Sequence, residues 1–208
     1  MCCFASLTTA RKPAEWVGAM GAPGVASPPC AADAVGDNRP VVTTIDALRA
    51  PAPGWTALPD FSELAATHSF VSGDPGGDRL RVALFRRDDD GAVVGRAWFG
   101  PHAEGPPGYV HGGAMAALLD EAMGLCCWVA GHRVLAKELT VGFRRPLPLL
   151  TTVTLECPIT AVDGRAVTTS GRLLLPGGEV AAEARGTFAT LPAERLARLF
   201  ARRSPFGG

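Results

Sequence analysis

The stretch that decides the fold runs from residue 111 to residue 129 and reads HGGAMAALLDEAMGLCCWV. It contains no proline, and its apolar residues recur at spacings of three and four, which predicts a helix from Gly112 to about Val129. The apolar stripe consists of Met115, Leu118, Leu119, Ala122 and Cys126. Because this helix is apolar nearly all round, a sheet or a partner must cover it.

Strand-like segments flank the helix on both sides in the sequence. Two of them, residues 79–87 and 92–99, come before it and are joined by the turn sequence DDDG. Four more follow it, separated by turns rich in proline, glycine and aspartate, and they cover residues 136–144, 152–162, 165–175 and 179–190. Short turns between consecutive strands predict an antiparallel sheet. The predicted class is α+β, with an antiparallel sheet wrapped around one long central helix.

The composition divides the chain into three predicted parts. Residues 1–53 are rich in proline, alanine and glycine and are expected to be a disordered or low-complexity extension, with a short element near 41–49. Residues 54–192 form the folded domain, with a short helix expected at 60–67. Residues 193–208 are a C-terminal helical tail, whose inward side chains are Leu196, Leu199 and Phe200.

Charge and cysteine usage exclude several classes of protein. The 208 residues carry 20 basic and 20 acidic side chains, and this balance argues against a nucleic-acid partner. No apolar run is expected to reach the ~18–20 residues of a membrane helix, so no membrane partner is expected. The six cysteines lack the spacing of a disulfide framework or a zinc site, and Cys126 and Cys127 are expected to be inert core thiols. We therefore expect a cytoplasmic protein with no metal and no cofactor.

Asp120 is out of place on this apolar helix. Its neighbours three and four positions away are small or apolar, namely Ala116, Ala117, Met123 and Gly124. A carboxylate on such a surface is partnered, lies near a cleft, or has its pKa raised by desolvation. The small neighbours also allow another chain or a thin ligand to come close.

The start of the helix has the composition of an oxyanion site. Gly112 and Gly113 open it, and its first N–H groups have no partner within the helix. Gly112 and Asp120 are eight residues apart, roughly 12 Å along the axis, whereas one reaction centre spans roughly 7–8 Å. Two antiparallel helices from two chains would bring the glycine end of one to the aspartate of the other. The spacing therefore predicts an obligate dimer with two composite sites.

At these residues the sequence resembles the hotdog-fold acyl-CoA thioesterases of the phenylacetate-pathway (PaaI-like) type. The similar segments read EGPPGYVHGG, AALLDEAMG, VGFRRPLP, DGR and EVAAEARGTF, and together they span about residues 58–190. The resemblance implies a hotdog fold in a dimer or a dimer of dimers. It also implies that Asp120 is the general base or nucleophile of thioester hydrolysis. Gly112 N–H would hold the thioester oxygen, and His111 would shape that loop and hydrogen-bond near the carbonyl.

Four further residues are candidates for binding substrate: Gly113, Glu121, Arg144 and Arg145. The two arginines would bind phosphate at the mouth of a coenzyme A channel, because guanidinium forks fit phosphate well. The alternative is plain surface charge, and for Glu121 it is a solvated or interface residue. One departure from the family stands out: Ala136 occupies a position where such proteins often place a threonine that helps hold the attacking water.

The predicted function is hydrolysis of acyl-CoA or acyl-carrier-protein thioesters to free acid and thiol. A non-catalytic acyl-CoA-binding protein stays open because of Ala136. An enoyl-thioester hydratase is a further alternative, although the Asp/His pair which that chemistry needs is not evident. Asp120 has the alternative role of a structural carboxylate, and His111 that of a residue that only begins the helix. The acyl group is left open by the sequence.

Overall fold

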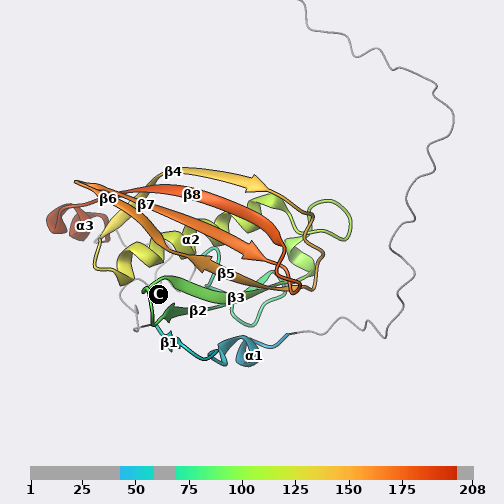
Figure 1. The fold of residues 1–208 in the computed structure, drawn as a ribbon. Coiled ribbons are helices and arrows are strands. Elements are labelled where there is room, and N and C mark those ends of the chain that lie inside the picture. Colours follow the sequence, from blue (N-terminus) through green and yellow to red (C-terminus); the bar gives the residue numbers. More distant parts are fainter. Residues whose placement is uncertain (1–42, 59–68, 201–208) are drawn as a thin grey trace, which may run out of the picture. The chain divides into compact units, whose positions relative to one another are not determined.

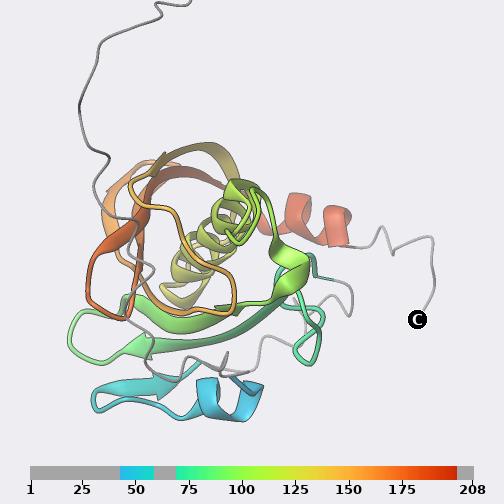
Figure 2. The ribbon, with the colours of Figure 1, turned by 90° about the vertical axis from the view of Figure 1, so that its right-hand side faces the viewer.

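One antiparallel sheet curls around one long helix, as Figures 1 and 2 show. The structure is a computed structural model that describes residues 43–58 and 69–200. Its sheet has eight strands in the order β1-β2-β3-β5-β7-β8-β4, with β6 pairing to β7 beside this path. The strands are β1 (Trp55–Ala57), β2 (Leu80–Arg87), β3 (Val93–Phe99), β4 (Val134–Phe143), β5 (Thr152–Cys157), β6 (Ile159–Asp163), β7 (Ala166–Leu174) and β8 (Val180–Thr190). The predicted sheet wrapped around a central helix is confirmed.

The central helix α2 (Gly112–Val129) has the predicted bounds. Seven of its side chains are buried by the sheet, namely Met115, Leu118, Leu119, Ala122, Met123, Cys126 and Cys127. Its 18 residues have a mean hydropathy of 1.2, which by length and composition alone is enough to cross a membrane. The expectation that no apolar run reaches that length was therefore wrong. A helix whose apolar side chains pack inside a curled sheet passes the same test of length and composition.

Glycines let the helix lie close against the sheet. A Cβ at Gly171 on β7 would lie 2.9 Å from Cδ2 of Leu119, and one at Gly186 on β8 would lie 3.3 Å from Cε of Met123. Real side chains do not tolerate the shorter of these distances. Both strands thus leave the room that the bulky residues of α2 fill, and the sheet bends around them.

The two faces of β2 serve two separate apolar clusters. Leu80, Val82 and Leu84 pack toward α2, whereas Ala83 and Phe85 point to the outer face. There α1 (Ile45–Arg49) covers the sheet, and its Leu48 is only 1% exposed. Side chains that alternate between two buried faces are what a covered strand requires.

Ordered structure thus begins upstream of residue 54, where the folded domain was predicted to begin. The short element expected near residues 41–49 is present as α1, because Leu48 has an apolar surface to pack against. The predicted boundaries of the three parts otherwise stay a prediction. Residues 1–42 and the helix expected at 60–67 lie outside the described residues.

The remaining differences from prediction are local. The run expected as one strand over 152–162 is two strands, β5 and β6, separated at Pro158, since proline lacks the N–H that a ladder needs. The proline-rich loop before α2 contains a short 3₁₀ helix, η1 (Pro101–Ala103). The C-terminal helix α3 (Ala193–Phe200) is formed as predicted and buries Leu196, while the side chains of Leu199 and Phe200 are outside the described ones.

Candidate active site

The start of α2 leaves one backbone donor available. His111 is the N-cap: its Nδ1 accepts a hydrogen bond from Gly113 N–H at 2.9 Å, and its carbonyl accepts from Ala114 and Met115. No described residue accepts a hydrogen bond from Gly112 N–H. Because a helix has unsatisfied N–H groups at its N-terminus, this cap satisfies those of residues 113–115 and leaves that of Gly112 for a ligand.

Gly113 has a structural reason to be glycine. A Cβ at this position would lie 2.9 Å from Nδ1 of His111, too close for the capping geometry to survive. Its N–H donates to His111, so the structure gives Gly113 a part in the helix cap. The His111 ring, expected near the substrate carbonyl, is likewise occupied with the cap by one of its nitrogens.

The Phe143 ring lies against the Cα of Gly112, a contact that sequence reasoning missed. A Cβ at Gly112 would lie 3.1 Å from Cζ of the Phe143 ring. This residue ends β4 on the same face as Leu139 and Val141, yet 53% of it is exposed. The available signal was the alternation of residues 139, 141 and 143, which places an aromatic ring at the helix side of the strand end.

Asp120 has an unsatisfied carboxylate oxygen. Its Oδ1 is buried and has no hydrogen-bond partner in the described chain. Burial raises the pKa of the Asp120 carboxyl above the ordinary value for aspartate, because the ionised form loses hydration there. A buried acceptor without a donor is costly, so this oxygen is suited to a water or a substrate group that enters from outside.

One chain does not bring the donor and the carboxylate to one point. Gly112 is the first residue of α2 and Asp120 the ninth, and the helix between them is unbroken. Their separation along the axis is therefore roughly 12 Å. The premise that both groups lie on one rigid element is confirmed, whereas the second helix that would close the gap stays a prediction.

Glu121 holds a loop onto the helix. Its Oε2 accepts a hydrogen bond from Ser69 Oγ at 2.8 Å, and that hydroxyl also accepts from the N–H groups of Val71 and Ser72. The carboxylate thereby fixes the start of residues 69–72 against α2. This arrangement gives Glu121 a structural partner within the chain, one residue away from the candidate base.

The two candidate phosphate ligands are paired with acids on β8 or just before it. Arg144 Nε donates to Glu183 Oε1 at 2.9 Å, and Arg145 approaches Glu179 at 2.9 Å. The arginine side chains are 58% and 56% exposed. Exposed pairs of this kind are weak, so a phosphate can replace the carboxylate at small cost.

Ala136 lies at an irregularity of β4. It pairs with Phe188, whereas Glu138 pairs with Thr187, so that Lys137 is an extra residue in a bulge. Bulges re-aim side chains and occur next to active sites. The methyl group of Ala136 offers no hydrogen bond to a water, and the second partner of an attacking water is therefore not supplied by this residue.

The described residues contain no group of three or more His, Cys, Asp or Glu side chains that would hold a metal ion. Cys126, Cys127 and Cys157 are free and buried. Burial raises the pKa of the Cys127 thiol to about 12 and shifts the pKa of the other two thiols in the same direction. These thiols are therefore neutral core groups rather than nucleophiles.

Comparison with known proteins identifies relatives of this site. Residues 107–182 match the family model described as thioesterase superfamily. The acyl-coenzyme A thioesterase THEM4 of Bos taurus is 32% identical over 108 residues, which is 52% of this chain and 44% of that protein. The Xenopus laevis THEM4 is 30% identical over 132 residues, covering 56% of this chain and 58% of its own. The chain thus spans about half the length of the curated relatives it matches.

A solved structure supports the fold. The crystal structure of a protein described as a thioesterase superfamily member aligns with a TM-score of 0.53 and 32% sequence identity. The alignment covers 57% of this chain and 58% of that one. The matched region of the sequence includes α2, with both Gly112 and Asp120, and the whole of β4.

Proposed function

Because residues 107–182 belong to the thioesterase superfamily and the chain has the hotdog fold, we propose that this protein hydrolyses acyl-CoA or acyl-carrier-protein thioesters to free acid and thiol. The names of the matched relatives, acyl-coenzyme A thioesterases, support this activity. One observation carries the proposal. A single helix offers an unpartnered backbone donor at Gly112 and an unpartnered buried carboxylate oxygen at Asp120.

In the proposed mechanism Asp120 activates water. Its unpartnered Oδ1 accepts a proton from the water as the water oxygen attacks the thioester carbonyl carbon. Burial raises the pKa of Asp120, which brings its basicity closer to neutral pH and makes it a better proton acceptor than an exposed aspartate. Direct attack by the carboxylate, with an anhydride that water then opens, uses the same residue in the same place.

The carbonyl oxygen becomes negative during attack and needs a donor. Gly112 N–H is free, and the N-terminus of α2 adds the positive end of its dipole. His111 keeps this donor in place by capping Gly113 rather than by contacting the substrate. The thiolate then leaves with the electron pair of the C–S bond and takes up a proton. Arg144 and Arg145 are the proposed contacts for the phosphates of coenzyme A.

The second helix that the mechanism needs is proposed to come from a second copy of the chain. Strand β4 pairs with β8 on one side, and no described strand pairs with its other side. Leu135 and Phe143 on this strand are 47% and 53% exposed. Because an open edge ten residues long is a template for another strand, two copies can pair through β4 and set their α2 helices antiparallel. Assembly beyond a dimer stays open.

The experiment that tests the function is thiol release from a panel of acyl-CoAs by the wild type and by Asp120→Asn. We expect turnover to fall by about three orders of magnitude or more in the variant, with a thermal unfolding temperature no lower than that of the wild type, because asparagine cannot accept the proton but fills the same space. Asp46→Asn, at an exposed position of α1, is the matched control and keeps full activity. Activity of Asp120→Asn near that of the wild type would reject the assignment.

A non-catalytic acyl-CoA-binding protein is the second candidate, and Ala136 is the observation that favours it. The same panel separates the two functions, since a binding protein retains acyl-CoA in equilibrium dialysis without releasing thiol. The free thiols among the described cysteines support the proposal of a cytoplasmic location.

A further inference from the structure

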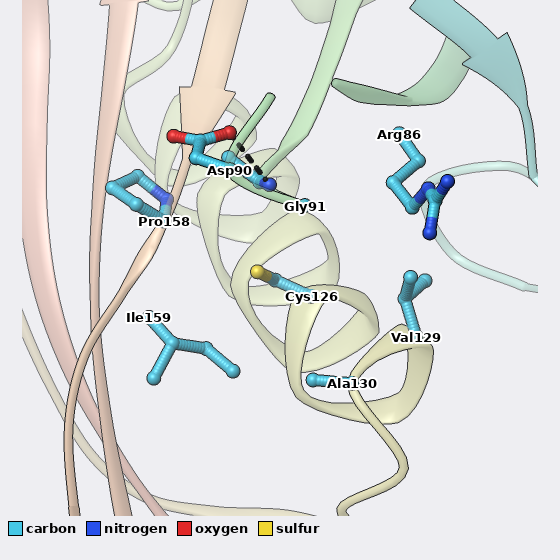
Figure 3. A pocket seen from close by; sticks show the side chains of 9 residues that line it. Arg86, Asp90, Gly91, Cys126, Val129, Ala130, Pro158 and Ile159 are labelled. Atoms are coloured by element: carbon cyan, nitrogen blue, oxygen red, sulfur yellow. Dashed lines mark hydrogen bonds between the residues drawn. The ribbon is translucent and has the colours of Figure 1, made fainter. Parts of the chain in front are cut away.

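A cavity of about 240 Å³ opens at the far end of α2, away from the helix start that carries Gly112. It lies where the turn between β2 and β3, the last turn of α2 and the start of β6 meet. Figure 3 shows Arg86 on the Val129 side of the helix end, and the Cys126 thiol pointing to the side where Pro158 and Ile159 lie; all five residues line the cavity. None of the residues proposed for thioester hydrolysis lines this cavity.

The helix geometry separates this cavity from Asp120. Cys126 is six residues further along α2, which places it roughly 9 Å along the axis and about 120° around it. Val129, which also lines the cavity, lies on the side of the helix opposite Asp120. The cavity and the candidate base thus belong to different faces of the helix.

Arg86 breaks the apolar pattern of its strand at the cavity. Leu80, Val82 and Leu84 pack toward α2, and Arg86 is the next residue on that face. A cation therefore stands where the alternation would put an apolar side chain, and the cavity takes up the missing volume. Arg86 is exposed and has no hydrogen bond or ion pair with any other described side chain.

Asp90, the acid at the cavity rim, already forms an ion pair with Arg87. Both oxygens of Asp90 accept hydrogen bonds from Arg87, at 2.9 and 2.6 Å, and Asp90 also accepts from the N–H of Ala92. The hydrogen bond from Arg87 holds the pKa of Asp90 well below its usual range, so Asp90 stays ionised and paired, while Arg87 also contacts Asp89 and Glu156. Arg86 is therefore the cation of the cavity lining that forms no ion pair with a described acid.

The floor of the cavity is apolar. It includes the Cys126 thiol, Val129 and Ile159. Burial raises the pKa of Cys126, which makes this group an uncharged lining atom at neutral pH. With ~30 Å³ per water molecule in the liquid, the volume holds roughly eight non-hydrogen atoms. This is far less room than coenzyme A needs.

We propose that this cavity binds a small monocarboxylate with an apolar tail of about five or six carbons. The carboxylate pairs with the guanidinium of Arg86, whose fork matches its two oxygens, and the tail packs on Cys126, Val129 and Ile159. The site does not depend on the proposed hydrolysis. If that hydrolysis holds, the acids it releases belong to the same chemical class as this ligand.

The test is isothermal titration of the full-length wild type with hexanoate at neutral pH. We expect saturable binding with a Kd of about 0.1–1 mM, given the size of the ligand. Hexanamide lacks the charge and acetate lacks the tail, and each should bind at least tenfold more weakly. Arg86→Gln should weaken hexanoate at least tenfold, and Ala130→Leu should do the same by filling the cavity. Arg185→Gln, at another exposed arginine, is the matched control.

Three outcomes would overturn the proposal. These are no saturable hexanoate binding to the wild type, an unchanged Kd in a folded Arg86→Gln variant, and equal affinity for hexanoate and hexanamide. Asp120→Asn should bind hexanoate as the wild type does, and a loss there would move the ligand to the candidate active site. Since no thioester is used, failure of this test leaves the proposed hydrolysis unaffected.

Discussion

The two edges of the sheet differ in length and in protection. The β1 edge is only three residues long, and its neighbourhood is tied down: Thr56 Oγ1 donates to Asp88 at 2.6 Å, and Arg96 stacks 5.0 Å from the centre of the Trp55 ring. The β4 edge is ten residues long and exposes Leu135 and Phe143. A short edge limits unwanted pairing, whereas a long open one invites a partner.

The proposed chemistry of the molecule lies on the side of the longer edge. Phe143 at the end of β4 lies against Gly112, so the proposed oxyanion donor adjoins the strand that is left unpaired. On the β1 side, α1 and the outer apolar cluster contribute packing and hydrogen bonds, and none of the residues proposed for hydrolysis lies in that cluster. This difference indicates that changes at the β4 edge affect activity, while changes near β1 affect stability alone.

The largest effect should come from closing the β4 edge to a partner. Leu135→Asp puts a charge on this edge, and in a two-fold pairing each copy contributes one. We expect a monomer at micromolar concentration in light scattering and about a hundredfold loss of thiol release. The matched control is Val162→Asp on β6, where Val162 is 53% exposed and Leu135 is 47% exposed. This control should change neither the oligomeric state nor thiol release. A fully active monomeric Leu135→Asp protein would contradict the composite site.

Gly112→Ala should lower kcat by about 10- to 100-fold. The added methyl group would lie 3.1 Å from the Phe143 ring, and either the ring or the donor must move. Adding Phe143→Ala should recover part of the loss by removing the clash. The matched control is Gly76→Ala, where a Cβ meets nothing within 4 Å. Wild-type kcat in Gly112→Ala would remove this N–H from the mechanism.

The pH profile should reveal the environment of Asp120. Burial raises the pKa of Asp120 above the ordinary ~3.9. Because the base must be ionised to act, kcat/KM should fall tenfold per pH unit once the pH drops below this raised pKa. The free energy of unfolding should change in the opposite direction to the rate and fall as pH rises. Below the unfolded pKa the carboxyl is neutral and its burial adds no ionisation cost, whereas above the folded pKa the full cost of burying the charge applies. Rates measured from pH 3 to 8 check this, and an acid limb at or below ~3.9 would refute it.

The smallest effect on activity is expected from Leu48→Ala on the β1 side. Leu48 is 1% exposed in the outer cluster, and removing its side chain should lower the free energy of unfolding by about 2–3 kcal/mol. Turnover per folded molecule should stay at the wild-type level. Urea unfolding and thiol release measured on the same sample decide the point, and a large drop in kcat would show that the two sides are coupled.

Local patterns predicted most elements closely. The bounds of α2 match, and the predicted strand at 79–87 is observed as Leu80–Arg87. These features depend on side-chain periodicity, which a single segment displays by itself. The break at Pro158 was missed although the proline was visible, and β1 was missed because three residues carry too little pattern.

Asp120 and Gly112 were identified from the sequence, because a lone carboxylate and a glycine pair stand out on an apolar helix. The sequence by itself therefore determined the helix and the class of fold, and it supplied the candidate catalytic residues. Only the tertiary structure decided that Phe143 lies against Gly112, that Ser69 donates a hydrogen bond to Glu121 and that Arg86 lines a cavity. Periodicity and residue type are local properties, whereas these contacts join residues far apart in the chain and arise only when the sheet closes around α2.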